Sequence, residues 1–393
     1  MVLAVVICAC ALMRAACDAS PDGAVDGPEG ARVRLDTTAI TKRAERLDLD
    51  PATPDADAPR LVWVKRIWDR APWNGRGELI RFSGAWFCAF KEGLRHTNER
   101  QDELDRVGCR IITSTDTDTW TSVVKFQHDE VLFENATLRV APDGRLMCLL
   151  CQDTPKGIED LDAWSRKYSR IANWVSFSQD GRTWTEPLPI RYRNAAGEPV
   201  RLDREIFHLD CHGGAIYAIP RGCGLWRSGD GVNYTQVKRV STEPRGARFA
   251  DHETALRICP NGEMIALCRS HRPPGQIACS RPPYTHWTVR RIPHAAHGPN
   301  FVILPGGQMW AVSRETDEAG KPPYRTVLYK MTRTAYEPAL ALPSGGDTSY
   351  AGMAWHANFL WVSYYSSHES RTLGKEAVLY LAKVKLPDPA SQR

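Results

Sequence analysis

The sequence lacks the features of several protein classes. Its apolar segment at residues 2–13 is too short to span a bilayer, so we expect no stable membrane insertion. It has no basic run with interleaved aromatic residues, and 46 acidic residues nearly offset 51 basic ones to leave a net charge of +5. Nucleic-acid binding is therefore not expected. Long helical periodicities are also absent, which argues against a mainly helical fold.

The 12 cysteines lack the spacing of a disulfide framework or a zinc site. Cys8, Cys10 and Cys17 lie in or next to the apolar start, and the others are scattered without paired CxxC motifs. We expect these thiols to pack as small hydrophobic side chains. No metal and no cofactor are predicted, because no histidine pair has the spacing of a metal-binding helix. The histidines nearest the predicted ligand loops are His96, His208, His252 and His368.

The start of the chain is typical of an exported protein. Small residues follow the apolar segment from Ala15 to Ser20, as a signal peptidase requires, although no basic residue precedes that segment. We predict a signal peptide at residues 1–17, a flexible leader at residues 18–58 and the folded domain at residues 59–390. The protein would then be periplasmic or extracellular. A lipid anchor at Cys17 and a misassigned start codon are the alternatives.

A hairpin unit recurs six times from Leu61 onward. Its turns are Ser83-Gly84, Asp143-Gly144, His212-Gly213, Asn261-Gly262, Gly306-Gly307 and Ala357-Asn358. A nearly continuous apolar strand follows each turn, which indicates sheets that are packed on both faces. The second turn residues are 60, 69, 49, 45 and 51 residues apart, the length of a four-stranded blade. We therefore predict an all-β fold, a six-bladed β-propeller of four-stranded antiparallel blades.

A second motif joins an aspartate turn to an aromatic residue. It reads Ser178-Gln179-Asp180-Gly181-Arg182-Thr183-Trp184, recurs at residues 228–234 and is looser at residues 114–120. The aspartate can bond the N–H groups of its own turn while the aromatic ring packs into the blade, so we expect a structural role. This pattern is the Asp-box, or BNR repeat. Through it, residues 60–388 resemble the sialidase (neuraminidase) superfamily, which implies a sialidase-like propeller.

Charged residues recur where a propeller binds its ligand, at one mouth of the central channel. The first strands of the six hairpins start at Glu78, Glu134, Glu205, Glu253, Asn300 and Tyr350. The second strands end at residues that include Arg269 and Arg314, and antiparallel pairing places Glu253 beside Arg269. Guanidinium groups can bind a carboxylate bidentately, so this ring suits an acidic sugar. A phenol of pKa about 10 needs a neighbouring base to become a nucleophile, and Glu253 could face Tyr350 across the channel.

The resemblance assigns catalytic roles to three of these positions. Sialidases depart from hydrolysis by two carboxylates, and the family implies a tyrosine nucleophile, a glutamate that activates it and a carboxylic acid/base. These correspond to Tyr350, Glu253 and Glu92.

The family also implies three arginines that hold the substrate carboxylate. Arg269 and Arg314 match two of them. The first of the three arginines is either Arg66 or Arg76. Arg66 lies in Lys65-Arg66-Ile67-Trp68, the segment most similar to the motif of the family, whereas Arg76 lies at the better spacing before the turn at Ser83-Gly84. Glu369 resembles the glutamate that steadies an arginine, and Glu78 and Glu134 are predicted to bind sugar hydroxyls.

The predicted function is a retaining exo-glycoside hydrolase of sialidase type, acting on the terminal acidic sugar of a glycan or glycoconjugate. Two alternatives remain open. One is a glycan-binding propeller without catalysis, which would release no sugar. The other is a propeller hydrolase or lyase acting on another sugar. Elimination would give a product lighter by one water than hydrolysis does.

Overall fold

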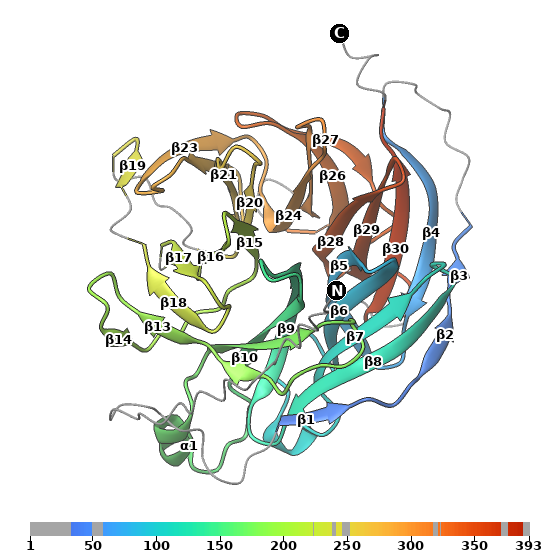
Figure 1. The fold of residues 1–393 in the computed structure, drawn as a ribbon. Helices are drawn as coiled ribbons and strands as arrows, with labels where there is room; N and C mark the ends of the chain where they lie inside the picture. Colours follow the sequence, from blue (N-terminus) through green and yellow to red (C-terminus); the bar gives the residue numbers. More distant parts are fainter. Residues whose placement is uncertain are drawn as a thin grey trace, which may run out of the picture.

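The computed structural model describes residues 33–48, 58–222, 224–237, 241–245, 252–316, 321–322, 324–370 and 376–387. The predicted signal peptide and part of the predicted leader lie outside these ranges. The described residues form six mainly antiparallel sheets in a ring, which is the six-bladed propeller predicted from the sequence (Figure 1).

Each sheet is built on a hairpin at one of the six predicted turns. From the axis outward, the first blade consists of β5 (Trp73–Phe82), β6 (Ala85–Gly93), β7 (Gly108–Ser114) and β8 (Thr119–His128). The second blade consists of β9 (Leu132–Val140), β10 (Leu146–Asp153), β11 (Ala172–Ser178) and β12 (Leu188–Pro189). The third blade consists of β15 (Leu209–His212), β16 (Ala215–Ala218), β17 (Trp226–Ser228) and β18 (Asn233–Gln236). β13 (Arg191–Arg193) and β14 (Pro199–Val200) extend the third blade at its outer edge.

The remaining blades follow the same plan. The fourth blade consists of β20 (Thr254–Ile258), β21 (Met264–Cys268), β22 (Gly275–Ser280) and β23 (His286–Ile292), and β19 (Ser241–Glu243) pairs with the outer edge of β23. The fifth blade consists of β24 (His297–Ile303), β25 (Met309–Glu315), β26 (Arg325–Met331) and β27 (Tyr336–Ala341). The sixth blade consists of β28 (Thr348–His356), β29 (Phe359–Ser366), β30 (Val378–Lys385) and β4 (Arg60–Trp68). The first strands of neighbouring blades contact one another all round the ring.

The ring is closed by a strand from the start of the folded domain. β4 pairs antiparallel with β30, so the last blade joins the two ends of the propeller. β1 (Val33–Asp36) and β2 (Thr41–Arg43) pair with β8, and β3 (Glu45–Arg46) pairs with β4. Residues 33–46, within the segment predicted as a flexible leader, thus lie on the sheets. They cover two outer edges that would otherwise expose unpaired backbone groups.

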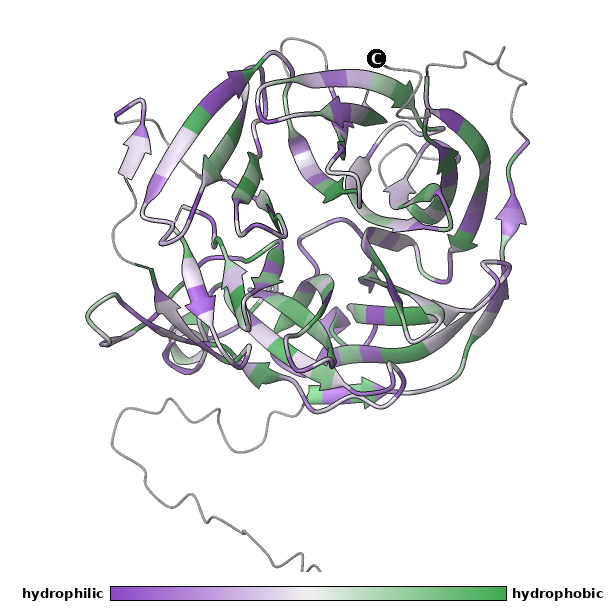
Figure 2. Cartoon of the chain, turned by 45° about the horizontal axis from the view of Figure 1, so that its top comes forward, coloured by the Kyte–Doolittle hydropathy of each residue, from purple (hydrophilic) through white to green (hydrophobic). Residues whose placement is uncertain are grey.

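The blades pack through apolar side chains on both faces of their inner strands. Cys148 and Leu150 of β10, for example, share one buried cluster with Ile111 and Val124 of the first blade. Figure 2 shows hydrophobic stretches along the strands of every blade. The eight cysteines among the described residues are all free thiols, and six of them are buried.

The aspartate turns have the structural geometry expected from the sequence. Oδ1 of Asp180 accepts hydrogen bonds from the backbone N–H groups of Arg182 and Thr183, at 2.8 and 2.7 Å. The indole N–H of Trp184 donates to the carbonyl of Gly181 at 3.1 Å, which closes the turn against the blade. The turns at Asp116 and Asp230 repeat the aspartate contacts.

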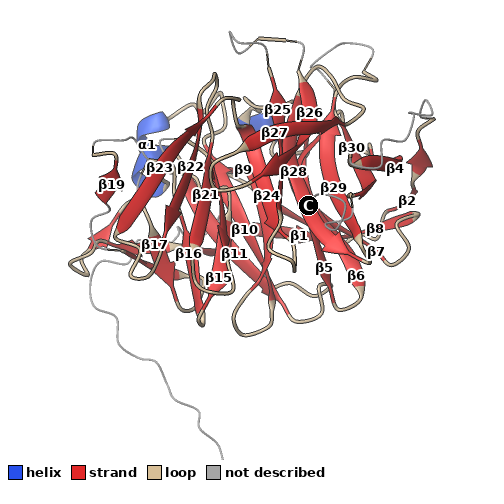
Figure 3. Ribbon diagram, turned by 90° about the horizontal axis from the view of Figure 1, so that it is seen from above, coloured by secondary structure: helices blue, strands red, loops and turns tan. Residues whose placement is uncertain are grey.

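Two short helices lie at one end of the strands, away from the hairpin turns (Figure 3). They are η1 (Gln101–Glu103), between β6 and β7, and α1 (Leu161–Lys167), between β10 and β11. This is the end at which the first strands begin. Among the described residues, no helix has the length and hydrophobicity needed to cross a membrane.

Candidate active site

A pocket of ≈ 270 Å³ lies on the propeller axis where the first strands begin, and all six blades contribute to its wall. Its arginines are Arg76, Arg221, Arg269 and Arg314. Its carboxylates are Glu134, Asp153, Glu205 and Glu253, and Tyr350 completes the reactive groups. The sequence places these residues far apart, and closure of the ring brings them into one pocket.

Tyr350 and Glu253 are hydrogen-bonded in this pocket. The phenolic hydroxyl donates to Oε1 of Glu253 at 3.2 Å. Arg269 Nη1 donates to the phenolic oxygen at 2.7 Å and also to Oε1 of Glu253. The ring of Phe207 stacks on Tyr350 with centroids 5.7 Å apart. The phenol is therefore held between a base and a cation.

The pKa values of this pair set the protonation states of the phenol and the carboxylate before any reaction. Burial, and then the charge of Glu253, raise the pKa of Tyr350 to about 12 despite the three neighbouring arginines. Burial also acts to raise the pKa of Glu253. The charge and hydrogen bond of Arg269, together with the charge of Arg76, outweigh it and hold that pKa below its ordinary value. At neutral pH the phenol is protonated and Glu253 is an ionised base.

Three arginines surround the tyrosine. The guanidinium carbons of Arg76 and Arg269 lie 5.3 and 5.9 Å from the centroid of the Tyr350 ring, and Arg314 lines the same pocket. Nε of Arg76 and Nε of Arg269 are buried without a hydrogen-bond partner among the described residues. Buried donors rarely lack partners in folded proteins, and both of these belong to arginines that line the pocket.

Each of the three arginines is held by another side chain. Arg76 Nη2 lies 3.0 Å from Nε2 of His96, and Arg269 Nη2 contacts Nε2 of His297. Arg314 Nη2 donates to Oδ1 of Asp347 at 2.8 Å, while the other oxygen of Asp347 contacts Nδ1 of His96. Burial and nearby arginines lower the pKa of both histidines, so each imidazole is neutral and accepts a hydrogen bond from its arginine.

Bulges at the start of three first strands aim the site residues. The register is irregular between Gly75 and Glu78 in β5, between His297 and Asn300 in β24, and between Ser349 and Gly352 in β28. Each bulge contains a residue with a left-handed backbone: φ is 60° at Arg76, 58° at Gly298 and 46° at Tyr350. Arginine and tyrosine rarely adopt this conformation, and strain of this kind is concentrated at functional sites.

Four residues predicted to act in the site lie outside the pocket lining. Arg66 belongs to β4, the outer strand of the last blade, where it pairs with Glu369 at 2.8 Å. The predicted partnership of Glu369 with an arginine is therefore present, but away from the axis. Of the two alternatives for the first arginine, only Arg76 reaches the pocket.

Glu92 and Glu78 are buried in separate polar clusters. Glu92, predicted as the acid/base, accepts hydrogen bonds from the indole of Trp68 at 2.9 Å and from Nε of Arg110 at 2.8 Å. Burial acts to raise the pKa of Glu92, but Arg110 and Lys125 outweigh it and hold that pKa below its ordinary value. Glu78, predicted to bind sugar, lies 3.2 Å from Arg139. Neither carboxylate lines the pocket. The Glu92 side chain on β6 is buried within the blade, and the bulge in β5 directs Arg76, rather than Glu78, into the pocket.

Several site residues carried no sequence assignment. Asp347 and Phe207 lie in loops, His297 lies at the bulge of β24, and Asp153 is the last residue of β10. None of these positions is one that strand counting selects. Sequence position alone could have indicated two of them, because Asp347 and His297 each lie three residues before a predicted strand start. Among the described residues, no group of three or more histidine, cysteine or acidic side chains is placed to hold a metal ion.

No known family model and no curated protein matches this chain. Solved structures do match it. A protein of unknown function from Dyadobacter fermentans DSM 18053 is 16% identical with a TM-score of 0.63, over 84% of this chain and 99% of that one. The phage phi92 endosialidase is 11% identical with a TM-score of 0.57, over 83% of this chain and 69% of that one. Trypanosoma rangeli sialidase is 10% identical with a TM-score of 0.53, over 86% of this chain and 59% of that sialidase. At these identities the likeness shows the fold, a sialidase-like propeller.

Proposed function

We propose that the protein is a retaining exo-glycoside hydrolase that removes a terminal acidic sugar, sialic acid or a related one, from a glycan. The observation that carries this proposal is the hydrogen bond from Tyr350 to Glu253, in a pocket where three of the four arginines surround the tyrosine. Structural likeness to the phage endosialidase and the trypanosomal sialidase supports a glycoside hydrolase on this fold.

The geometry accounts for a tyrosine nucleophile. The carboxylate of an acidic sugar would repel an ionised carboxylate nucleophile beside it, whereas a protonated phenol carries no charge to repel. Glu253 accepts the phenolic proton as the Tyr350 oxygen bonds to the anomeric carbon, so Glu253 becomes neutral and no full negative charge builds up on the phenolic oxygen. A glycosyl–tyrosine intermediate then reacts with water to release the sugar with retained configuration.

The arginines supply recognition of the acidic group. A guanidinium group donates two parallel hydrogen bonds to a carboxylate, and the effect is strong where water is excluded. Arg76, Arg269 and Arg314 come from three blades, so a bound carboxylate would be gripped from several directions. The trypanosomal protein has been solved with sialic acid and, as a covalent intermediate, with 2,3-difluorosialic acid.

Hydrolysis of aryl sialosides and aryl uronides by the wild type and by Tyr350→Phe tests the proposal. We expect turnover of one of these acidic substrates, loss of it in the variant, and covalent labelling of Tyr350 by a matching fluorosugar detected by peptide mass. Equal turnover by wild type and variant would remove Tyr350 from the mechanism. Glycan binding without release of sugar would instead indicate a non-catalytic propeller, and a product lighter by one water would indicate a lyase.

A further inference from the structure

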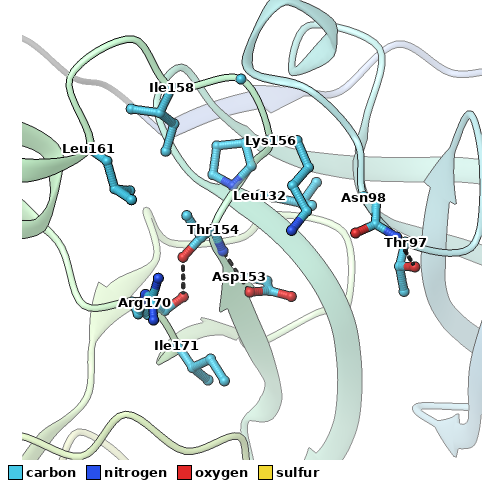
Figure 4. A pocket seen from close by; sticks show the side chains of 12 residues that line it. Thr97, Asn98, Leu132, Asp153, Thr154, Lys156, Ile158, Leu161, Arg170 and Ile171 are labelled. Atoms are coloured by element: carbon cyan, nitrogen blue, oxygen red, sulfur yellow. Dashed lines mark hydrogen bonds between the residues drawn. The ribbon is translucent and has the colours of Figure 1, made fainter.

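A groove of ≈ 450 Å³ adjoins the pocket (Figure 4). Thr97 and Asp153 line both, so the groove continues directly from the pocket. The segment between β10 and β11, which contains α1, forms most of its wall, and the loop after β6 forms the opposite side. The groove is therefore a feature of the first two blades, whereas the pocket belongs to all six.

We propose that this groove binds the leaving group of the glycan substrate, and that Asp153 donates the proton to the glycosidic oxygen. The proposal rests on the proposed function. A sugar held by the arginines beside Tyr350 has its glycosidic oxygen where the pocket opens, and the rest of the glycan must leave through an adjoining space. Asp153 lies at that junction, because it is the carboxylate that lines both cavities.

The other two carboxylates of the pocket suit this step less well. Glu134 already accepts a hydrogen bond from the buried Nζ of Lys91, at 2.8 Å, and does not line the groove. Burial and the charge of Glu253 raise the pKa of Glu205 too, but Glu205 lies 3.4 Å from Arg221 and does not line the groove. Asp153 forms no ion pair with a cation in the described part of the chain; its Oδ1 accepts the N–H of Thr154 at 2.7 Å. Desolvation and the nearby Glu134 raise the pKa of Asp153, which favours its protonated form.

The protons balance over the reaction. In the first step the Asp153 proton passes to the glycosidic oxygen as its bond to the anomeric carbon breaks, and the leaving group departs as an alcohol. The Tyr350 oxygen bonds to the anomeric carbon and its proton passes to Glu253. In the second step Asp153 takes a proton from the attacking water. The bond to Tyr350 breaks, and Glu253 returns the phenolic proton.

The groove has the chemistry of a sugar-binding surface. Leu132, Ile158, Leu161 and Ile171 give it an apolar side, which can pack against the C–H face of a sugar ring. The polar side chains include Lys156, which extends between Thr154 and Asn98 in Figure 4 and can donate to hydroxyl or carboxylate oxygens. The leaving group that fits is a sugar residue, neutral or acidic.

Kinetics with two classes of leaving group test the role of Asp153. In Asp153→Asn, kcat for an oligosaccharide substrate should fall about 10²- to 10⁴-fold, the usual contribution of general acid catalysis. Formation of the intermediate from a nitrophenyl glycoside should change far less, since nitrophenolate departs without protonation. Burst kinetics separate that step from hydrolysis of the intermediate. Asp143→Asn, in the exposed turn between β9 and β10, is the control and should leave both substrates unaffected.

A matched pair of exposed leucines tests the groove. Leu161, in the groove, is 42% exposed and Leu188, on the outer strand of the same blade, is 50% exposed. Leu161→Ser should raise KM several-fold for oligosaccharide substrates whose leaving group is acidic, neutral or either, and should leave KM for the nitrophenyl glycoside unchanged. Leu188→Ser should leave KM unchanged for the oligosaccharides and for the nitrophenyl glycoside. Equal effects of Asp153→Asn on both leaving groups, or of Leu161→Ser on both substrates, would overturn the proposal. Failure of the wild type on every substrate would instead overturn the proposed function.

Discussion

Replacement of Asp347 by asparagine tests whether the arginines are organised before the substrate binds. Asp347 accepts hydrogen bonds from Arg314 at 2.8 Å and from the hydroxyl of Tyr365 at 2.9 Å, and it contacts Nδ1 of His96. His96 in turn holds Arg76. One carboxylate thus supports two of the three arginines, one directly and one through a neutral imidazole.

The magnitude follows from the number of charge-assisted contacts. A hydrogen bond to a charged group contributes about 1.5–3 kcal/mol and a neutral one about 0.5–1.5 kcal/mol, so each weakened contact costs about 1–1.5 kcal/mol. Two such contacts, with Arg314 and His96, give about 2–3 kcal/mol, which corresponds to a roughly 30- to 150-fold loss of affinity. The arginines bind the acidic group both before and during reaction, so the loss should raise KM of Asp347→Asn and leave kcat nearly unchanged.

Steady-state kinetics on the best acidic aryl glycoside, with thermal unfolding in parallel, measure this effect. Unfolding shows whether the variant is folded at the assay temperature. His96→Gln should reproduce a smaller part of the rise in KM, because it removes only the support of Arg76. A KM within twofold of the wild type in folded Asp347→Asn would refute the reasoning. A fall in kcat at unchanged KM would contradict it equally, since it would place Asp347 in the chemical step.

Four further outcomes are expected. Glu253→Gln removes the base, so kcat should fall about 10²- to 10⁴-fold in the same assay. Burial and nearby arginines lower the pKa of His297 from its ordinary value of 6.5, so as the pH falls this histidine is protonated in the unfolded chain before it is protonated in the folded protein. The free energy of unfolding in urea should therefore fall as pH drops below 6.5, and less so in His297→Gln. Gly298→Ala adds a Cβ where φ is 58° and where Ser349 leaves no room, so kcat and the melting temperature should both fall. Arg76→Ala should raise KM for the acidic substrate. Arg66→Ala breaks a half-buried ion pair with Glu369 outside the pocket, so it should leave KM unchanged.

The sequence was sufficient to predict the propeller because its hairpins are local. Each of the six predicted turns joins two adjacent strands, and the apolar strand after each turn is packed between blades. Hairpin pairing also predicted that Glu253 and Arg269 are neighbours, and the backbone N–H of Arg269 donates to the carbonyl of Glu253 at 2.9 Å. Contacts that follow from one hairpin are read directly from the order of residues.

Contacts that depend on bulges or on ring closure were not predictable in this way. A bulge shifts which residue points to the axis, so strand counting selected Glu78 where the pocket contains Arg76. Ring closure moves the first strand of the folded domain to the outside of the last blade, which places Arg66 there. The sequence pattern around Arg66 and Glu92 matched a site, but neither pattern encodes where its strand lies in the ring.

The charges around the three arginines are compatible with the proposed acidic substrate, although the pocket also contains carboxylates. Arg269 has the carboxylate of Glu253 in contact, and Arg314 has that of Asp347. The nearest carboxylate oxygen to Arg76 belongs to Glu134, at 3.9 Å, and Glu134 is shared with Lys91. The closer partner of Arg76 is the imidazole of His96, which orients the guanidinium without cancelling its charge. A carboxylate in that place would fix Arg76 equally well but would repel the anion that the site is proposed to bind.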